Sequence, residues 1–273
     1  MNKHGFGSIV AITSVTYEFS LMHHWFAYYH SLGVDKFIVA VGDFINPNLP
    51  NSFKEEFRDI KNLKVVRVSE RFRRTGYEGD DKEEIRKRYC RRHDWIIPAD
   101  PDEFVQFPDK LTSIIAQMQI KRCNHVVGYL VDRIAQDGQL TQDVKNKSLW
   151  EQYPLEVDIS QRLVKCWCRK LVFVRGNVPL GAGAHYIKER RNNFFFKNRL
   201  LRDDCNVHHF KWRASLREAL ERRVSYYEKA NIPSLPESRR VLDYIKLKGR
   251  IVPEEFNARP GWVPEAEQVL DIA

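Results

Sequence analysis

Three acidic side chains within four residues are the part of this sequence with the clearest chemical potential. Asp100, Asp102 and Glu103 directly follow an apolar run at 95–99 (WIIPA). Carboxylate oxygens are the ligands that hard divalent cations such as Mg²⁺ and Mn²⁺ prefer. A cation held there would bridge two phosphates and neutralise the charge that develops on a departing nucleoside diphosphate. The cluster therefore predicts a Mn or Mg site for a phosphorylated substrate, and the alternative is an acidic turn that caps a helix.

The segments before these acids alternate regularly between two patterns. Short apolar runs rich in β-branched residues alternate with segments of helical spacing. The expected strands cover 8–14, 36–41, 63–68 and 95–99, and the expected helices cover 18–32, 53–60 and 80–93. This order is typical of an α/β fold with a mostly parallel sheet covered by helices. In such sheets ligands bind beyond the carboxyl ends of the strands, which is where the acids lie.

The pattern changes after residue 110. The further elements that we expect are a helix at 111–120, strands at 126–134 and 166–174, and helices at 216–230 and 239–247. From residue 252 the chain is rich in Pro and Gly. We therefore predict a catalytic domain at 1–230 and a C-terminal helical extension and tail at 231–273.

Composition restricts the classes of partner. The 273 residues carry a formal charge of +9, which suits phosphorylated partners, but 36 acidic residues are mixed among 45 basic ones. This mixture argues against a nucleic-acid partner. The five cysteines are scattered, so a disulfide framework is not expected. No stretch approaches the roughly 20 apolar residues of a membrane span, so we expect a cytoplasmic protein; peripheral contact with the inner face of the membrane stays open.

Four segments together resemble one enzyme family. Asp94–Phe104 has the form D-W-x-x-x-x-D-x-D-E-F, which resembles the family 2 type glycosyltransferases, particularly bacterial members with a GT-A-type fold. Three further segments are similar to the same group, namely 25–37 (WFAYYHSLGVDKF), 128–140 (GYLVDRIAQDGQL) and 208–213 (HHFKWR). Pro101 departs from the family pattern, where a small residue is more familiar, and it stiffens the turn.

The resemblance implies a fold and an activity. The fold would be of the GT-A type (Rossmann-like), with a C-terminal helical extension. The activity would be metal-dependent, inverting transfer of a sugar from a nucleotide-diphospho-sugar to a hydroxyl acceptor, in glycan or polysaccharide synthesis. The acceptor would be a saccharide, a lipid-linked molecule or a protein.

The resemblance also suggests which residues hold the donor. Thr13, Ser14 and Tyr17 follow the first strand, where the base and ribose would lie, and Tyr17 would stack on the base. Asp43 ends the second strand and Asp100 the fourth, both on the donor side. Thr13, Ser14, Tyr17 and Asp43 also fit ordinary turns and helix starts.

Inverting transfer needs a base that removes the proton from the acceptor hydroxyl. Asp132 at the end of an apolar strand is the first candidate, and Asp137 is the second. A local ion pair between Asp132 and Arg133 is the alternative for the first.

A basic segment would complete the site. His209 is a candidate metal ligand, with His208 as the alternative, since a neutral imidazole binds such ions. Lys211 and Arg213 would hold the diphosphate. His185 lies in a glycine-containing loop and would line the acceptor side, or belong to a surface loop.

Two other functions compete with glycosyl transfer. A metal-dependent nuclease or phosphatase would use the same acids, but the sequence shows no second group of metal ligands of the kind that two-metal hydrolysis needs. A non-catalytic binding module on the same fold is the other alternative, and the intact acids weigh against it.

Overall fold

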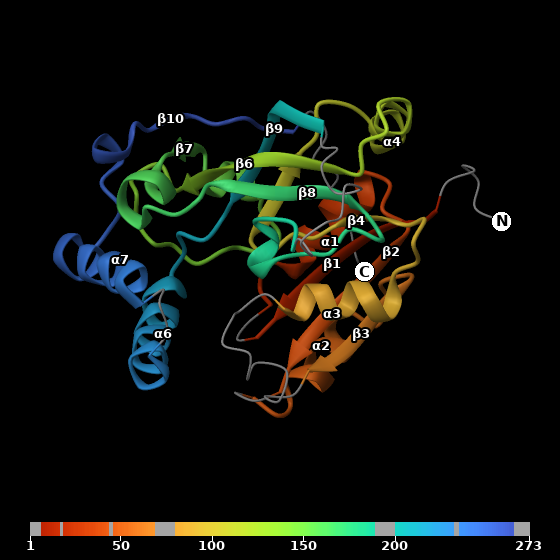
Figure 1. The fold of residues 1–273 in the computed structure, drawn as a ribbon. Coiled ribbons are helices and arrows are strands. Elements are labelled where there is room, and N and C mark those ends of the chain that lie inside the picture. The colour runs from red at the N-terminus through yellow and green to blue at the C-terminus, as the bar shows by residue number, and fades with distance from the viewer. Residues whose placement is uncertain are drawn as a thin grey trace. The chain divides into compact units, whose positions relative to one another are not determined.

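A computed structural model describes residues 7–16, 19–43, 46–68, 80–188, 200–231 and 235–264. The chain divides into two compact units (Figure 1). The first unit contains 1–129, 169–207 and 270–273, and the second contains 130–168 and 208–269. The predicted domain boundary after residue 230 does not coincide with this division, because the helices on either side of it pack together in the second unit.

Four parallel strands form the first part of the first unit. They are β1 (Ile9–Val15), β2 (Lys36–Gly42), β3 (Leu63–Val68) and β4 (Trp95–Ile97). β1 lies between β2 and β4, and β3 pairs with β2 on its other side. The helices between them are α1 (Met22–Ser31), α2 (Leu49–Glu56) and α3 (Asp80–Tyr89). The α/β alternation predicted from the sequence is confirmed.

Antiparallel pairing extends this sheet. β8 (Arg169–Arg175) pairs with β4 and with the first residues of β6 (His125–Ile134). β5 (Glu103–Gln106) pairs with β9 (Leu200–His209), and α4 (Leu111–Ile120) follows β5 in the chain. These pairs require long-range partners, and β5, which is only four residues long, was not expected from the sequence.

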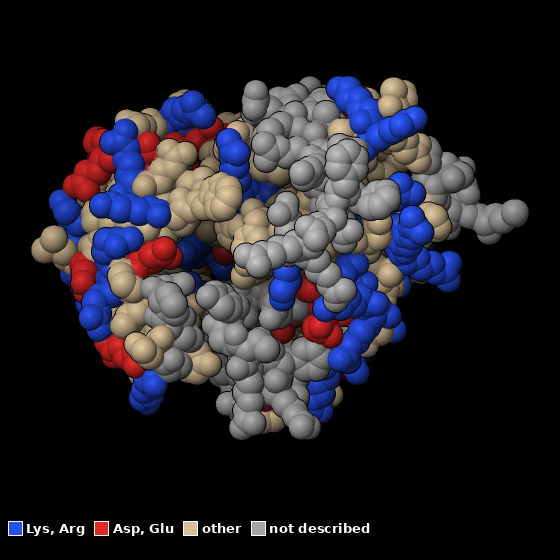
Figure 2. All heavy atoms as spheres, viewed as in Figure 1, with Lys and Arg blue, Asp and Glu red and all other residues tan. Residues whose placement is uncertain are grey.

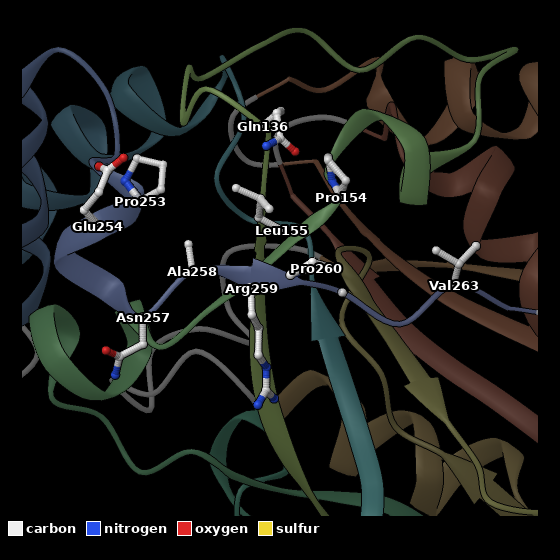
Figure 3. A pocket seen from close by; sticks show the side chains of 11 residues that line it. Gln136, Pro154, Leu155, Pro253, Glu254, Asn257, Ala258, Arg259, Pro260 and Val263 are labelled. Carbon is white, nitrogen blue, oxygen red and sulfur yellow. The ribbon is translucent and has the colours of Figure 1, made fainter.

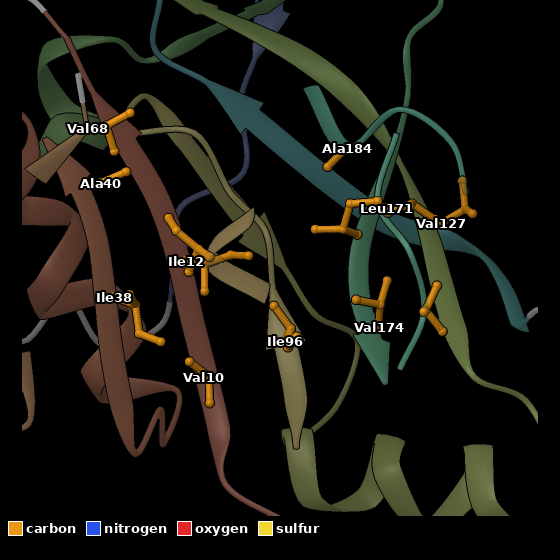
Figure 4. Close-up of a cluster of buried hydrophobic side chains, with 13 residues drawn as sticks. Val10, Ile12, Ile38, Ala40, Val68, Ile96, Val127, Leu171, Val174 and Ala184 are labelled. Atoms are coloured by element: carbon orange, nitrogen blue, oxygen red, sulfur yellow. The ribbon is translucent and has the colours of Figure 1, made fainter. Parts of the chain in front are cut away.

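The two faces of the parallel strands are covered by different helices. Phe37 packs against the rings of Trp25 and Phe26 in α1. The next residue, Ile38, belongs to a core cluster that includes Ile85 of α3 (Figure 4). Because side chains along a strand point alternately to opposite faces, α1 and α3 cover opposite faces of the sheet. Helices therefore shield both faces of the parallel strands from solvent, and a ligand can reach these strands at their ends.

The second unit has its own core. Its elements are α5 (Leu149–Gln152), β7 (Leu155–Val157), η2 (Ser160–Val164), α6 (Leu216–Ala230), α7 (Leu235–Lys248), η5 (Pro253–Phe256) and β10 (Arg259–Pro260). β7 pairs antiparallel with the end of β6 and with β10. Apolar side chains of α6 and α7 pack with those of β7 around Trp212. Gly138 turns the chain after β6 at φ +71°, where a Cβ atom would lie 1.8 Å from the Ile251 carbonyl oxygen.

Charges are interspersed on the face shown in Figure 2, with Lys and Arg gathered along α3 and acidic side chains among them. None of the helices in the described ranges has the length and apolar character that a membrane span requires. The five cysteines carry free thiols.

Candidate functional site

Three neighbouring parallel strands bring predicted donor-site residues to one edge. Thr13 and Ser14 lie near the carboxyl end of β1, Asp43 directly follows β2, and Asp100 follows β4. Thr13 is fully buried, and its hydroxyl has no hydrogen-bond partner in the described part of the chain. Asp43 accepts a hydrogen bond from Arg67 at 2.6 Å. Tyr17 lies outside the described residues.

Aromatic side chains of α1 hold the backbone of the acidic loop. Trp25 donates its indole N–H to the carbonyl of Asp100 at 3.1 Å. Tyr29 donates to the carbonyl of Glu103 at 3.0 Å and accepts from the N–H of Val105 at 3.3 Å. Tyr28 donates to the carbonyl of Val105 at 2.8 Å. Burial raises the pKa of both tyrosines, so both hydroxyls stay protonated and able to donate. The loop is therefore fixed before any ligand binds.

Two lysines contact the two oxygens of Asp100. Lys82 Nζ lies 2.5 Å from Oδ1, and Lys170 Nζ lies 2.9 Å from Oδ2. The Lys82 and Lys170 side chains are 2% and 3% exposed, whereas that of Asp100 is 34% exposed. Asp100 thus presents a carboxylate at the surface with two ammonium groups behind it.

Glu103 belongs to the same network. One of its oxygens lies 2.5 Å from Lys170 Nζ, and the other accepts the backbone N–H of Asp100 at 3.0 Å. Its side chain is 4% exposed. Asp102, between the two, is partly exposed. The structure therefore brings Asp100 and Glu103 together, with Lys170 as their shared partner.

The electrostatics of Asp100 follow from this geometry. Desolvation opposes ionisation, but Lys170 and Lys82 outweigh it and hold the pKa of Asp100 far below its ordinary value. In the same way Asp100 and Glu103 overcome the effect of burial and raise the pKa of Lys170. The contacts between Asp100 and Lys170 thus stabilise the charged form of each group.

The position of Lys82 is set by the anchoring of α3. Glu83 accepts hydrogen bonds from Arg86 and from the backbone N–H of Leu180. Arg86 donates in turn to the Gly176 carbonyl at 2.7 Å. The sequence motifs did not single out Lys82 within the helix expected at 80–93. Its spacing of three from the buried Ile85 was the available signal, because residues at that spacing share a helix face.

The charges of Lys170, Asp100 and Lys82 also act on His185. Its Nδ1 lies 2.8 Å from the carbonyl oxygen of Arg169, so Nδ1 carries the proton and Nε2 is left as the acceptor. Burial and, to a smaller extent, the charge of Lys170 together lower the pKa of His185 to about 4. The imidazole is therefore neutral at physiological pH.

In the second unit, Asp132 and His209 meet, but in the interior. Asp132 is 1% exposed and lies 3.1 Å from His209 Nδ1. It also accepts hydrogen bonds from the Ser160 N–H and hydroxyl and from the Trp212 indole. Desolvation opposes its ionisation, but these donors outweigh it and lower the pKa of Asp132. Base catalysis by Asp132 stays a prediction, and this enclosure weighs against it.

The remaining predicted residues of the second unit have varied surroundings. Arg213 is buried and pairs with Asp143 at 2.9 Å, so its guanidinium is already engaged. Lys211 is partly exposed and lies over the Trp212 ring. Asp137 is exposed in the turn before Gly138 and accepts the Gln139 N–H at 3.0 Å. Of these residues, Asp137 and Lys211 reach solvent.

The predicted divalent ion can be tested against these surroundings. No described residues form a group of three or more His, Cys, Asp and Glu side chains arranged to hold a metal ion. Asp100 and Glu103 share Lys170 as their partner, and His209 is paired with Asp132. The ion stays a prediction, and the described residues do not fit it, because ammonium groups already hold the carboxylate oxygens.

An open pocket of about 600 Å³ lies along β10 in the second unit (Figure 3). Its lining consists of Gln136, Pro154, Leu155, Pro253, Glu254, Asn257, Ala258, Arg259, Pro260, Gly261 and Val263. None of these residues was predicted as part of a site, and most of the side chains are apolar or small. The pocket supplies no second cluster of catalytic groups.

The comparison with known proteins finds distant structural similarities. No protein-family model and no curated protein matches the chain. The structure of TarS from S. aureus is similar over 87% of this chain at 11% identity and a TM-score of 0.41, and this chain spans 43% of it. TarS residues 1–349 in complex with UDP-GlcNAc is similar over 90% of this chain and 77% of its own length, at 12% identity and a TM-score of 0.36. HddC from Yersinia pseudotuberculosis is similar over 77% of this chain and 97% of its own, at 8% identity and a TM-score of 0.37. Similarity at this level identifies no family.

Proposed function

We propose that this chain is a glycosyltransferase with a GT-A-type fold. It transfers a sugar from a nucleotide-diphospho-sugar to a hydroxyl group of a saccharide, lipid-linked or protein acceptor. The observation that carries the proposal is Asp100, an ionised and partly exposed carboxylate at the carboxyl edge of the parallel strands. A carboxylate in this place is suited to accept hydrogen bonds from the hydroxyls of a ribose or a hexose.

The surroundings of Asp100 support a donor site. Thr13 and Ser14 at the end of β1 and Asp43 at the end of β2 lie at the same edge, with Thr13 one strand and Asp43 two strands from Asp100. Polar groups from three strands can contact the separate parts of an extended nucleotide-sugar. The D-x-D-E-F motif and the three accompanying segments resemble the family 2 type glycosyltransferases, which supports the same conclusion.

The reaction that we propose is a single displacement with inversion. The acceptor oxygen forms a bond to the anomeric carbon while the bond from that carbon to the phosphate oxygen breaks. The nucleoside diphosphate leaves with the bonding electrons, and a base takes the acceptor proton. Of the two predicted carboxylates, Asp137 is the exposed one, and the Nε2 atom of His185, on whose charge Asp100 acts, is a further acceptor.

Donor binding and hydrolysis test the proposal. A panel of nucleotide-sugars is offered to the purified chain, with binding followed by calorimetry and nucleoside diphosphate release followed enzymatically. We expect one donor to bind and to turn over slowly with water. Asp100→Asn should reduce this turnover about 100-fold, the size expected when one group that stabilises the transition state is lost.

Asp59→Asn is the matched control for Asp100→Asn. Asp59 is a solvent-exposed carboxylate of the same unit, and its substitution should leave turnover unchanged. Failure of every nucleotide-sugar to bind, or equal turnover by Asp100→Asn and the wild type, would overturn the proposal. Cleavage of DNA without any effect of nucleotide-sugars would favour a nuclease instead.

A further inference from the structure

We infer that the donor site at Asp100 works without a divalent cation, because Lys82 and Lys170 already offset the carboxylates that a cation would otherwise neutralise. This inference rests on the proposed function and departs from the metal-dependent activity that the sequence motif implies. It follows from which atoms touch the carboxylate oxygens of Asp100 and Glu103.

Ammonium groups are already the cationic partners of the Asp100 and Glu103 carboxylates. Both oxygens of Asp100 have a lysine nitrogen within 2.9 Å, and Lys170 is shared with Glu103 at 2.5 Å. The other oxygen of Glu103 is taken by the Asp100 N–H. A metal ion ligated by these two acids would share its ligand atoms with two cations of the same sign.

The lysines cannot move aside at low cost. Both side chains are almost fully buried, and Lys82 is held additionally by the Pro98 carbonyl at 3.2 Å. Displacing either ammonium would leave a buried charge without its carboxylate partner, which is strongly unfavourable. Lys82, Lys170, Asp100 and Glu103 therefore form a fixed ion-pair network that is poorly suited to bind a metal ion.

The charge balance removes the need for a metal. Unpaired acids at the end of β4 would repel the diphosphate of the donor, and a divalent cation would be required to bridge them. Here two ammonium groups offset Asp100 and Glu103, so the network presents no net charge to the donor. Asp100 can then accept a donor hydroxyl while the diphosphate approaches.

Lys82 and Lys170 act as positioning residues in this account. Their nitrogen atoms lie behind Asp100 and hold its carboxylate in one orientation and one charge state. Their effect on the donor passes through that carboxylate. A test of their role therefore needs a readout that mere destabilisation would leave unchanged, and the response to metal is such a readout.

The decisive experiment uses the wild-type chain. Turnover of the nucleotide-sugar panel is measured after dialysis against EDTA and again with added Mn²⁺ or Mg²⁺, and donor binding is measured in the same buffers. We expect the same rate and the same affinity in each buffer. Turnover that appears only with Mn²⁺ or Mg²⁺ would overturn the inference and leave the proposed function standing. No binding and no turnover in any buffer would overturn both.

Lys170→Met provides the second arm. It removes the shared ammonium and leaves one oxygen of Asp100 and one of Glu103 open to a cation. Turnover in EDTA should fall about 100-fold, and Mn²⁺ should now raise it. A loss of turnover that Mn²⁺ does not relieve, in a variant shown to be folded by circular dichroism, would count against the inference.

Arg133→Met is the matched control for Lys170→Met. Arg133 is a buried cation paired with a buried carboxylate, but its partner is Glu156 in the second unit. We expect this variant to lose stability and to show no response to Mn²⁺. A response to Mn²⁺ in Arg133→Met would overturn the assignment of the effect to the lysines beside Asp100.

Discussion

Asp100 in the first unit and Asp132 in the second are both candidate catalytic carboxylates in sequence, but their surroundings differ. Asp100 is 34% exposed and is held by two ammonium groups. Asp132 is 1% exposed, and its partners are two groups of Ser160, the indole of Trp212 and His209. Both carboxyl groups have a lowered pKa, so ionisation alone does not distinguish them.

Asp100 and Asp132 differ in how much of the carboxylate a ligand can reach. Donors surround the carboxylate of Asp132 inside the protein, so this group stabilises the second unit and has no surface to offer a substrate. Lys82 and Lys170 each hold one oxygen of Asp100 and leave part of its side chain in contact with solvent. The buried and fully hydrogen-bonded carboxylate of Asp132 thus contributes to stability. The partly exposed carboxylate of Asp100 can contact a ligand.

The largest effect that separates the two carboxylates should come from Asp132→Ala. Its removal leaves the donors of Ser160, Trp212 and His209 buried without an acceptor. We expect the free energy of unfolding to fall by about 3 kcal/mol, measured by urea denaturation. Asp59→Ala, at an exposed position, should change it by less than about 0.5 kcal/mol. A similar small change for Asp132→Ala would remove the contrast with Asp100.

Much of the fold could be predicted from local pattern. The expected strands at 8–14, 36–41 and 63–68 agree closely with β1, β2 and β3, because each is an apolar run that signals burial by itself. The short strands β7 and β10 were not predicted, since they have three and two residues and exist through pairing with distant segments. The helix expected at 53–60 begins earlier, at Leu49, with Pro50 in its first turn.

The site could be predicted only in part. The position of Asp100 beyond β4 and its closeness to Glu103 follow from neighbouring sequence. Its partners do not, because Lys82 lies 18 residues before it and Lys170 lies 70 residues after it. Which group pairs with a carboxylate depends on residues that only the tertiary structure brings close. The motif alone is therefore compatible with a metal ion or with lysines as the partner of Asp100.

Histidines provide a pH test in each unit. Burial lowers the pKa of His185 to about 4 and that of His208 well below its ordinary value, with Lys170 and Arg133 acting in the same direction. Because the unfolded chain binds these protons more readily, the stabilising contribution is present above about pH 6.5. It should be lost as the pH falls toward the folded pKa of His185, about 4.

His185→Gln isolates the contribution of the first unit. Lys170 and Lys82 lower the pKa of His185 beside the effect of burial, and Asp100 opposes them. We expect the variant to remove about 1–2 kcal/mol of the acid-induced loss, less than the full shift because the imidazole is partly exposed. Unfolding curves at several pH values measure it. An unchanged pH dependence would show that His208 and other groups account for the loss.

The smallest effect concerns the support of the acidic loop by α1. Tyr29→Phe removes a hydroxyl that bonds both the Glu103 carbonyl and the Val105 N–H, so we expect a loss of about 1 kcal/mol in the free energy of unfolding. Tyr28→Phe is the matched control, since its hydroxyl donates to the Val105 carbonyl. If the loop positions Asp100 for the donor, Tyr29→Phe should also raise KM for the nucleotide-sugar more than Tyr28→Phe does. Equal KM values for the two variants would show that the orientation of Asp100 depends on the lysines alone.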